Sequence, residues 1–337
     1  MISIIVPVYN RSDEIVEFLI SFSRQTCKNF EIVIVDDGSE EDLKTVIEPF
    51  NKQLSLLYIC QNNMGPGLAR NTGMKLANGD LFVFIDSDCT VPPDYIKNIL
   101  HHFKIDDFDV FGGPDTYHDN FPVFLKAVNY GMTSFIGTAG SRAGRNRRIV
   151  KYYPRSFNMG IKRKVYEKIG GMIDLRHGQD MEYSSRILKA GFRVKYFEDV
   201  FVYHKRRTDF RKYFKQIYNW GIARHNLRRL DRRLLRPVHA LPTFVILLFL
   251  LSIVGSFIWD WTRIIFYIEM VIFMLIILFV IVEAGVKYKS IGVGFTSVPV
   301  ILTQVLAYGL GFLFGLFKTL FKKDENFIEG YKKDYYK

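Results

Sequence analysis

Ile32-Val33-Ile34-Val35-Asp36-Asp37-Gly38-Ser39 is an apolar run that ends abruptly in two acids and a turn. A strand that is apolar along its whole length is typical of a sheet buried on both faces, and such sheets are mostly parallel. In parallel sheets, ligands bind beyond the carboxyl ends of the strands. The stretch therefore predicts a covered parallel sheet and also the edge of that sheet where polar ligands bind.

The flanking sequence repeats this unit. Short β-branched runs alternate with helical periods over residues 1–110, which favours βαβ units and an α/β fold with a mostly parallel, twisted sheet. We expect one helix that buries Ile15, Phe18, Leu19 and Phe22, and another that begins near Pro66. The expected strands are residues 2–8, 31–35, 54–59 and 81–85.

Three polar segments follow apolar strands and are expected at one sheet edge: Pro7-Val8-Tyr9-Asn10, Asp36-Asp37-Gly38-Ser39 and Asp86-Ser87-Asp88. The two acids of the last segment would supply hard oxygen ligands for Mg²⁺ or Mn²⁺ beside a diphosphate, although an ordinary turn has the same composition. The middle segment indicates either hydrogen-bond acceptors for a base and ribose or an Asx turn.

A glycine-rich segment, residues 63–73, contains Pro66 at an expected helix start and Arg70 within the first turns. An arginine beside a helix N-terminus suits donor phosphates or the acidic cluster. The alternative is a helix cap with a solvated arginine.

Together these segments resemble the ordered signature of family 2 glycosyltransferases with the GT-A fold, over roughly residues 1–230. The resemblance implies an inverting enzyme that uses a nucleotide sugar and a divalent cation. It implies that Asp37 contacts the base, Asp86 the ribose side and Asp88 the metal. The other donor-binding residues it implies are Pro7, Tyr9, Asn10, Arg70 and Ser87. We expect a catalytic domain over residues 1–207, with a donor half (1–113) and an acceptor half (114–207).

Segments 156–161 and 177–182 resemble the acceptor side of the same family, with Asn158 and Gln179 as acceptor-side residues. Asp180 then becomes the catalytic base that takes the acceptor hydroxyl proton. The alternative is that Asp180 caps a helix over residues 183–189. Gln179 stands where the family often has Glu, which leaves the base but removes a neighbouring charge.

His204 follows an expected strand over residues 199–203 and is a further metal-ligand candidate, although a lone His is more often a partly buried side chain. Gln216 and Trp220 resemble a degraded Gln-x-x-Arg-Trp element of polysaccharide synthases, with Asn219 in place of Arg. The substitution weakens an inference of processive synthesis, while Trp220 could still stack on an acceptor sugar.

Residues 205–236 contain twelve Lys or Arg against two acids. Because apolar spans follow directly, we interpret this block as binding an anionic membrane surface rather than nucleic acid. Residues 208–236 should form a basic interfacial helix, although a core helix with a solvated basic face has the same periodicity.

A membrane region is expected at residues 237–320, with apolar stretches 241–259, 264–282 and 291–317, and a charged tail at 321–337. Pro299, Gln304 and several glycines favour a re-entrant or tightly packed third stretch and a cytosolic tail. The apolar stretch that begins at Ile2 is too short for a signal peptide and has neither a basic leader nor a small-residue cleavage site, so we expect a cytosolic catalytic domain. Cys27, Cys60 and Cys89 have no metal-type or disulfide-type spacing, which fits a reducing compartment.

The sequence thus predicts a multi-pass protein of the inner (cytoplasmic) membrane that transfers a sugar from a nucleotide sugar, with a weak preference for a UDP-sugar. The acceptor would be a lipid-linked or membrane-presented glycan. The alternatives are a processive polysaccharide synthase, which would need a pore, and a non-catalytic nucleotide-sugar-binding scaffold. A small transporter is disfavoured because Glu269 and Glu283 are the only acids in the spans.

Overall fold

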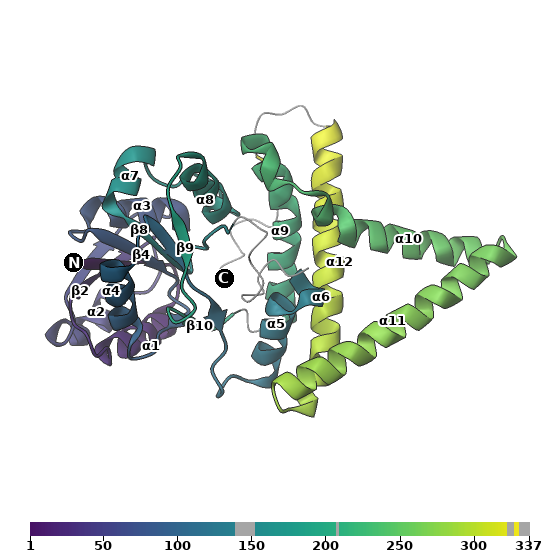
Figure 1. Cartoon of the computed structure of the whole chain (residues 1–337), viewed down its shortest axis with the longest axis horizontal. Coiled ribbons are helices and arrows are strands. Elements are labelled where there is room, and N and C mark those ends of the chain that lie inside the picture. The colour runs from purple at the N-terminus through teal and green to yellow at the C-terminus, as the bar shows by residue number, and fades with distance from the viewer. Residues whose placement is uncertain (139–151, 207–208, 322–326, 330–337) are drawn as a thin grey trace. The chain divides into compact units, whose positions relative to one another are not determined.

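A computed structural model of the chain describes residues 1–138, 152–206, 209–321 and 327–329 (Figure 1). The chain forms two compact units. The described part of the first unit comprises residues 1–118 and 152–205, and that of the second comprises 119–138, 206, 209–321 and 327–329.

The first unit is built on a seven-stranded sheet in the order β3-β2-β1-β4-β8-β6-β9. Strands β1 to β4 are mutually parallel where they pair, β8 is antiparallel to β4 and β6, and β6 is parallel to β9. The predicted α/β fold with a mostly parallel sheet is confirmed. Its elements are β1 (Ile2–Val8), α1 (Ser12–Ser23), β2 (Phe30–Asp36), α2 (Leu43–Ile47), β3 (Leu56–Cys60), α3 (Pro66–Leu76), β4 (Leu81–Ile85), β5 (Cys89–Thr90), α4 (Tyr95–Ile105), β6 (Val110–Gly112), β7 (Asp115–Thr116), β8 (Asn158–Lys162), α7 (Arg163–Ile169), α8 (Gln179–Lys189), β9 (Val194–Tyr196) and β10 (Val202–His204).

Both faces of the sheet are covered, as the unbroken apolar strands indicate. Ile4 and Val6 of β1 pack in one layer with α1 and α4, while Ile5 between them packs in the other layer with α3, α7 and α8. All three side chains are fully buried. Each such burial contributes about 1.5–3 kcal/mol, so the alternation along one strand ties both helical layers to the sheet.

Several boundaries differ from expectation by a few residues. The strand expected at 54–59 is β3 at 56–60, and the strand expected at 199–203 is β10 at 202–204, so His204 lies inside a strand. The helix expected at 183–189 begins at Gln179, which places Asp180 in its first turn rather than before it.

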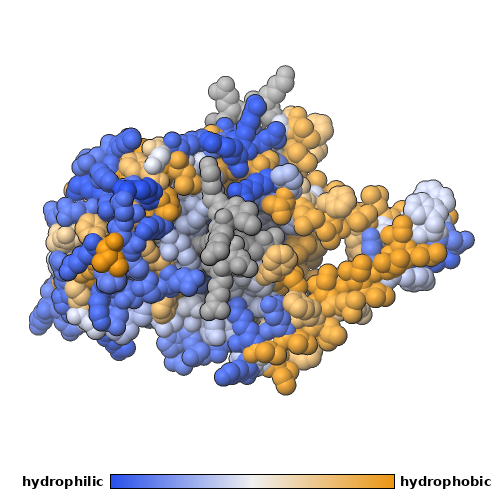
Figure 2. Space-filling view, in the orientation of Figure 1, coloured by the Kyte–Doolittle hydropathy of each residue, from blue (hydrophilic) through white to orange (hydrophobic). Residues whose placement is uncertain are grey.

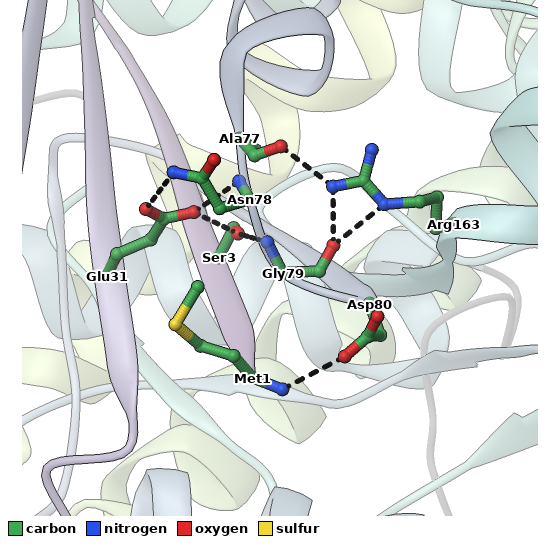
Figure 3. A network of polar contacts seen from close by, with 8 residues as sticks. All are labelled: Met1, Ser3, Glu31, Ala77, Asn78, Gly79, Asp80 and Arg163. Atoms are coloured by element: carbon green, nitrogen blue, oxygen red, sulfur yellow. Dashed lines mark hydrogen bonds and ion pairs between the residues drawn. The ribbon is translucent and has the colours of Figure 1, made fainter.

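The amino-terminal edge of the sheet is closed by a polar network (Figure 3). Ser3 Oγ donates to Glu31 Oε1 at 2.6 Å and accepts from Gly79 N at 2.8 Å. Glu31 also accepts from the backbone N of Asn78 at 2.6 Å. Arg163 donates to the carbonyl oxygens of Ala77 and Gly79. The turn between α3 and β4 is therefore held at the edge opposite to the predicted ligand site.

In its described residues, the second unit is built from helices. They are α5 (Val123–Thr133), α6 (Phe135–Thr138), α9 (Phe210–Leu230), α10 (Leu241–Ser256), α11 (Asp260–Lys287) and α12 (Ile291–Phe321), with short 3-10 turns at Arg232–Leu234 and Pro237–Ala240. Helices α5 and α6 lie inside the segment 114–207 that was expected to be one acceptor half. They belong instead to the helical unit, because α5 packs on α12, with Gly131 against Val300 and Gln304. The single boundary expected at residue 207 is corrected accordingly.

Among the residues that the structure describes, three segments are long and apolar enough to cross a membrane: Pro237–Ser256, Asp260–Lys287 and Ile291–Phe321, with mean hydropathies of 2.3, 3.0 and 2.0. They correspond to the three expected stretches with shifted ends. The last is one continuous helix through Pro299. Figure 2 shows that hydrophobic surface dominates α11.

Candidate active site

The pairing of β1 with both β2 and β4 brings the three polar segments to one edge of the sheet. Val8 pairs with Asp36 in parallel register, and Ile5 pairs with Phe84. The segments after these strands therefore start at the same carboxyl edge, as the sequence predicted.

Asp37 organises the loop that precedes α3. Its side chain is buried, and its carboxylate accepts from Gln61 Nε2 at 2.8 Å, Met64 N at 2.9 Å and Gly65 N at 2.8 Å. The neighbouring Asp36 accepts from the Tyr58 hydroxyl at 2.7 Å, and burial followed by this carboxylate raises the pKa of Tyr58. Both acids thus shape the edge as acceptors held in fixed positions.

The loops after β1 and β2 are bonded to each other. Asn10 adopts a left-handed backbone with φ of 50°, its N donates to Ser39 Oγ at 3.0 Å, and its Oδ1 accepts from Glu40 N at 2.8 Å. Pro7 and Tyr9, at the end of β1, are half-buried. This link orients the first polar segment beside the second.

Arg70 joins α3 to the acidic segment. Its guanidinium is 3% exposed, and Nη2 donates to Oδ1 of Asp86, which itself remains about one-third exposed. Ser87, between the two acids, is buried. With its amide oriented to satisfy its neighbours, Gln179 accepts from Arg70 Nη1 and from Gly67 N, each at 3.2 Å. The start of α8 therefore touches the same arginine that holds Asp86.

Asp88 lies between a guanidinium and an imidazole. Arg11 Nη1 is 2.6 Å from Asp88 Oδ2, and His204 Nε2 is 3.3 Å from Asp88 Oδ1. The other ring nitrogen of His204 is 3.3 Å from Asp115 Oδ2. Burial alone would lower the pKa of Arg11, but the charge and hydrogen bond of Asp88, together with the charges of Glu14 and Asp86, raise that pKa above its ordinary value.

A second, three-stranded sheet makes this cluster. Its order is β5-β10-β7, with His204 paired to Cys89 on one side and Val202 paired to Asp115 on the other. The strand pairing thus sets the imidazole between two carboxylates from distant parts of the chain.

The cluster fits a divalent cation. Asp88, Cys89 and His204 bring one ligand atom each to within 4.8 Å of one another. Burial, then the charge of Asp88, raises the pKa of the Cys89 thiol well above its ordinary value, so the thiol stays protonated and is a poor ligand. The carboxylate of Asp88 suits Mg²⁺ or Mn²⁺, and an imidazole oriented by a second carboxylate is a common partner ligand.

Asp180 keeps a partly exposed carboxylate at the start of α8. Its side chain is 20% exposed, and Arg155 Nη1 is 3.4 Å from Asp180 Oδ2. Asp180 Oδ1 accepts from the adjacent Met181 N at 2.8 Å. Asp180 directly follows Gln179, and the contact of Gln179 with Arg70 links this carboxylate to the acidic edge.

Residues 3–170 match the family described as glycosyl transferase family 2. The chain belongs to glycosyl transferase family 2. The glycosyltransferase AglE of Haloferax volcanii is 27% identical to it over 254 residues, which cover 74% of this chain and 81% of the relative. An uncharacterised glycosyltransferase of Rickettsia conorii is 40% identical over 135 residues, and there the match spans only 22% of the relative's length.

One solved structure shares the fold of this glycosyltransferase over nearly the whole chain. The mannosyltransferase PcManGT of Pyrobaculum calidifontis, in complex with GDP-Man and Mn²⁺, aligns over 96% of this chain and 88% of its own, with a TM-score of 0.62 and 16% identity. This likeness concerns the fold.

The predicted acceptor-side residues are divided between the two units of this glycosyltransferase, and Asn158 pairs with Ile85, the residue directly before the acidic segment. Asn158 is fully buried, where Oδ1 accepts from the Tyr95 hydroxyl at 2.7 Å and Nδ2 donates to the Val200 carbonyl at 2.7 Å. Its described contacts hold β8 to the chain before β10. Gln216 and Trp220 are half-buried on α9 of the helical unit.

The sequence interpretation did not identify three residues of the site: Arg11, Asp115 and Arg155. Arg11 directly follows the first polar segment, so a cation beside a predicted anionic site was a usable signal. Asp115 and Arg155 stand in no recognisable pattern. They reach the site through the β7–β10 pairing and through the segment before β8.

Proposed function

We propose that this glycosyltransferase is an inverting enzyme that uses a nucleotide-sugar donor, a UDP-sugar by preference, with Mg²⁺ or Mn²⁺. Its acceptor would be a lipid-linked or membrane-presented glycan in cell-surface glycan biosynthesis. The observation that carries the proposal is the contact of Gln179 with Arg70, because it links the candidate base segment to the donor-side acid Asp86. A base and a donor site must meet for direct displacement.

In this proposal the donor lies along the carboxyl edge. Asp37 and the loop it holds would face the base, and Asp86 the ribose side. Asp88 and His204 would hold the divalent cation, with Asp115 orienting the imidazole. A bound cation would neutralise the charge that develops on the leaving diphosphate. The Mn²⁺ and GDP-Man of the mannosyltransferase that shares the fold support a metal-bound donor.

Asp180 would act as general base. Its partly exposed carboxylate would accept the proton of the acceptor hydroxyl as that oxygen attacks the anomeric carbon. Arg155 would hold the carboxylate in one direction. A single attack from the face opposite the diphosphate inverts the anomeric configuration.

The helical unit supports an acceptor at a membrane. Five exposed arginines lie in the last turn of α9 and in the segment from there to α10: Arg228, Arg229, Arg232, Arg233 and Arg236. Basic side chains directly before an apolar span favour the cytoplasmic leaflet and its anionic lipids. We therefore place the catalytic domain in the cytosol, at the inner membrane.

The test uses the full chain in lipid nanodiscs, with UDP-, GDP- and dTDP-sugars, Mn²⁺ or Mg²⁺, and a membrane lipid extract as acceptor. We expect one nucleotide sugar to be consumed and the sugar to enter the lipid phase. Nuclear magnetic resonance of the product should show an anomeric configuration opposite to that of the donor. Retention of configuration, or no turnover of any donor, would contradict the proposal.

A further inference from the structure

Helices α10, α11 and α12 touch at three places that form the corners of a triangle. The start of α10 meets the middle of α12, where Thr243 Oγ1 donates to the Gly309 carbonyl oxygen at 2.8 Å. The end of α11 meets the start of α12, where a Cβ on Gly294 would lie 2.5 Å from the Ile281 carbonyl. Gly255 and Thr262 close the far corner. Figure 1 shows α10 and α11 diverging from α12 toward their shared tip.

The lengths of the three sides set the angles of this triangle. At 1.5 Å per residue, the contact points are about 22 Å apart along α12, about 18 Å along α10 and about 28 Å along α11. A triangle with these sides has a corner of about 90° between α10 and α12. Helices α10 and α12 therefore cannot both cross a bilayer along its normal.

Helix α9 decides which of them lies in the membrane plane. It runs beside α12 in the same direction, with the Tyr213 hydroxyl 2.7 Å from Gln304 Oε1 and His225 Nε2 3.0 Å from the Phe312 carbonyl. Because α9 and α12 pack side by side, α9 would also cross the bilayer if α12 did. The exposed Lys212 and Arg228 are only about 24 Å apart along α9, less than the ~30 Å hydrocarbon core.

If α9 crossed the bilayer, the charged side chains at one of its ends or at both would therefore lie inside the hydrocarbon core. Each would cost roughly 2.5–3.5 kcal/mol near the centre, and Lys215 and Arg224 lie between the two ends. The cost disappears if α9 and α12 both lie along the surface.

The exposed face of α12 suits that position. Leu306, Leu310, Leu313, Phe317 and Leu320 form one row, which we call the α12 stripe, and they are 47%, 43%, 37%, 56% and 68% exposed. Their spacing of four and three residues places them on a single helix face, while Gln304, Gly311 and Phe312 face α9. A one-sided apolar face beside a basic helix is the pattern of an interfacial segment.

The hairpin of α10 and α11 has the opposite character. In the most apolar 18-residue stretch of each segment, 17% of the residues are buried for α10 and 6% for α11, against 44% for α12. At the tip, the exposed rings of Trp259 and Trp261 stack with centroids 6.2 Å apart, and Arg263 pairs with Asp260 at 3.1 Å. Tryptophan and charge gather at membrane interfaces, and the 16 residues of α10 span about 24 Å, most of a hydrocarbon core.

We infer that α10 and α11 form the only bilayer-crossing hairpin among the described helices, and that α12, although apolar enough to cross, lies in the plane of the cytoplasmic leaflet. Its partner is the lipid surface. The α12 stripe rests on acyl chains, and the five exposed arginines at the end of α9 and after it contact anionic headgroups. This inference goes beyond the proposed function, because it holds whether or not the enzyme transfers a sugar.

The test measures depth along α12. Single cysteines replace Leu306, Leu313 and Leu320 in a full-length C27S/C60S background, where Cys89 is buried, and carry nitroxides in phosphatidylcholine–phosphatidylglycerol bilayers. Power-saturation resonance with oxygen and a nickel chelate reports depth, and circular dichroism checks the fold. Leu250→Cys and Leu275→Cys, exposed on α10 and α11, are the deep controls.

We expect the three α12 positions at one shallow depth and both controls deeper. A graded depth that changes by about 21 Å from position 306 to 320 would mean a crossing α12 and would overturn the inference. A second arm labels Phe327→Cys, just after α12, with an impermeant thiol reagent. It should react from the side on which the exposed Cys60 reacts in a separate C27S chain that keeps it, and Trp259→Cys from the other. Reaction of position 327 with the tip side would overturn the inference as well.

Discussion

Arg11 Nη1 lies 2.6 Å from Oδ2 of Asp88, the carboxylate best suited to a divalent cation. The guanidinium stays charged at any working pH, so it competes with a metal for the same oxygen. Asp86 is likewise held by Arg70. The acids of the site are thus already paired with cations, and a nucleoside diphosphate would add the negative charge that favours metal binding.

Arg11→Gln should therefore raise the affinity for Mn²⁺ alone. Removing a competing charge should tighten binding at least about fivefold, the lower end of ordinary coupling between sites. Resonance titration of free Mn²⁺, without nucleotide and then with UDP or GDP, measures the change. Arg11→Lys keeps the charge and is the matched control. If Arg11→Gln binds Mn²⁺ less tightly than the wild type, Arg11 positions Asp88 instead of competing for it.

Asp88→Ala should abolish sugar transfer while leaving the fold intact. The cation would lose its main protein ligand, and the leaving diphosphate its charge stabilisation. Because Arg11 loses its partner, a lower thermal midpoint is also expected. Product formation and circular dichroism are the measurements. Full activity in metal-free buffer would refute the metal role of Asp88.

Asp180→Asn should lower the transfer rate by several orders of magnitude with little change in donor affinity. The amide keeps the shape but cannot accept the acceptor's proton. Single-turnover rates and donor calorimetry separate the two effects. Arg155→Gln is a useful companion, since it should disturb the direction of the carboxylate and slow transfer less. A collapse of donor affinity in Asp180→Asn would make Asp180 a binding residue.

The sheet's opposite edge predicts a pH-dependent stability. Burial alone would raise the pKa of Glu31, but hydrogen bonds from Ser3 and Asn78 lower it (Figure 3). The carboxylate therefore stabilises the fold above its unfolded pKa of about 4.3, and this contribution is lost as pH falls through the folded pKa.

Glu31→Gln should cost about 1–3 kcal/mol in the free energy of unfolding at pH 7, and the difference from wild type should shrink toward pH 3. Denaturant unfolding across this range measures it. Glu17→Gln, on a half-exposed side chain, is the control. A difference that grows on acidification would contradict the assignment.

Glycine permits the contact between α9 and α12. A Cβ on Gly221 would lie 2.4 Å from the Tyr308 carbonyl oxygen and 2.6 Å from Phe312 N, both backbone atoms. Gly221→Ala should thus destabilise the helical unit by roughly 1–3 kcal/mol, although alanine favours helices. Gly285→Ala makes the same change where the nearest atom is 3.8 Å away, and it should be neutral or stabilising. Thermal unfolding in nanodiscs compares the two, and equal midpoints would argue against close helix contact.

The sequence predicted β1, β2 and β4 well because their side chains are buried on both faces, so hydrophobicity alone marks them. The half-buried β3 was predicted two residues too early at its start. The sequence also placed Asp37, Asp86 and Asp88 at one edge, since parallel strands share that edge. It did not reveal Asp115, because a two-residue strand such as β7 carries no periodic signal. It did not reveal Arg155 either, because that residue lies outside any helix or strand. Nor did it separate α5 from the catalytic domain, because an amphipathic helix does not encode which partner covers it.

The placement of α5 bears on how the protein is made. The helix leaves the ribosome early, yet it packs on α12, near the end of the chain, where Gly131 meets Val300 and Gln304. Until then its apolar residues Leu125, Val128 and Met132, buried in the finished protein, have no such cover. A nascent chain must be guarded against aggregation during that interval. For the same reason, a recombinant fragment that stops before residue 241 to gain solubility would keep α5 and α9 without α12. A soluble catalytic unit is better sought in a fragment that ends at residue 205 and has a short polar linker in place of residues 119–143.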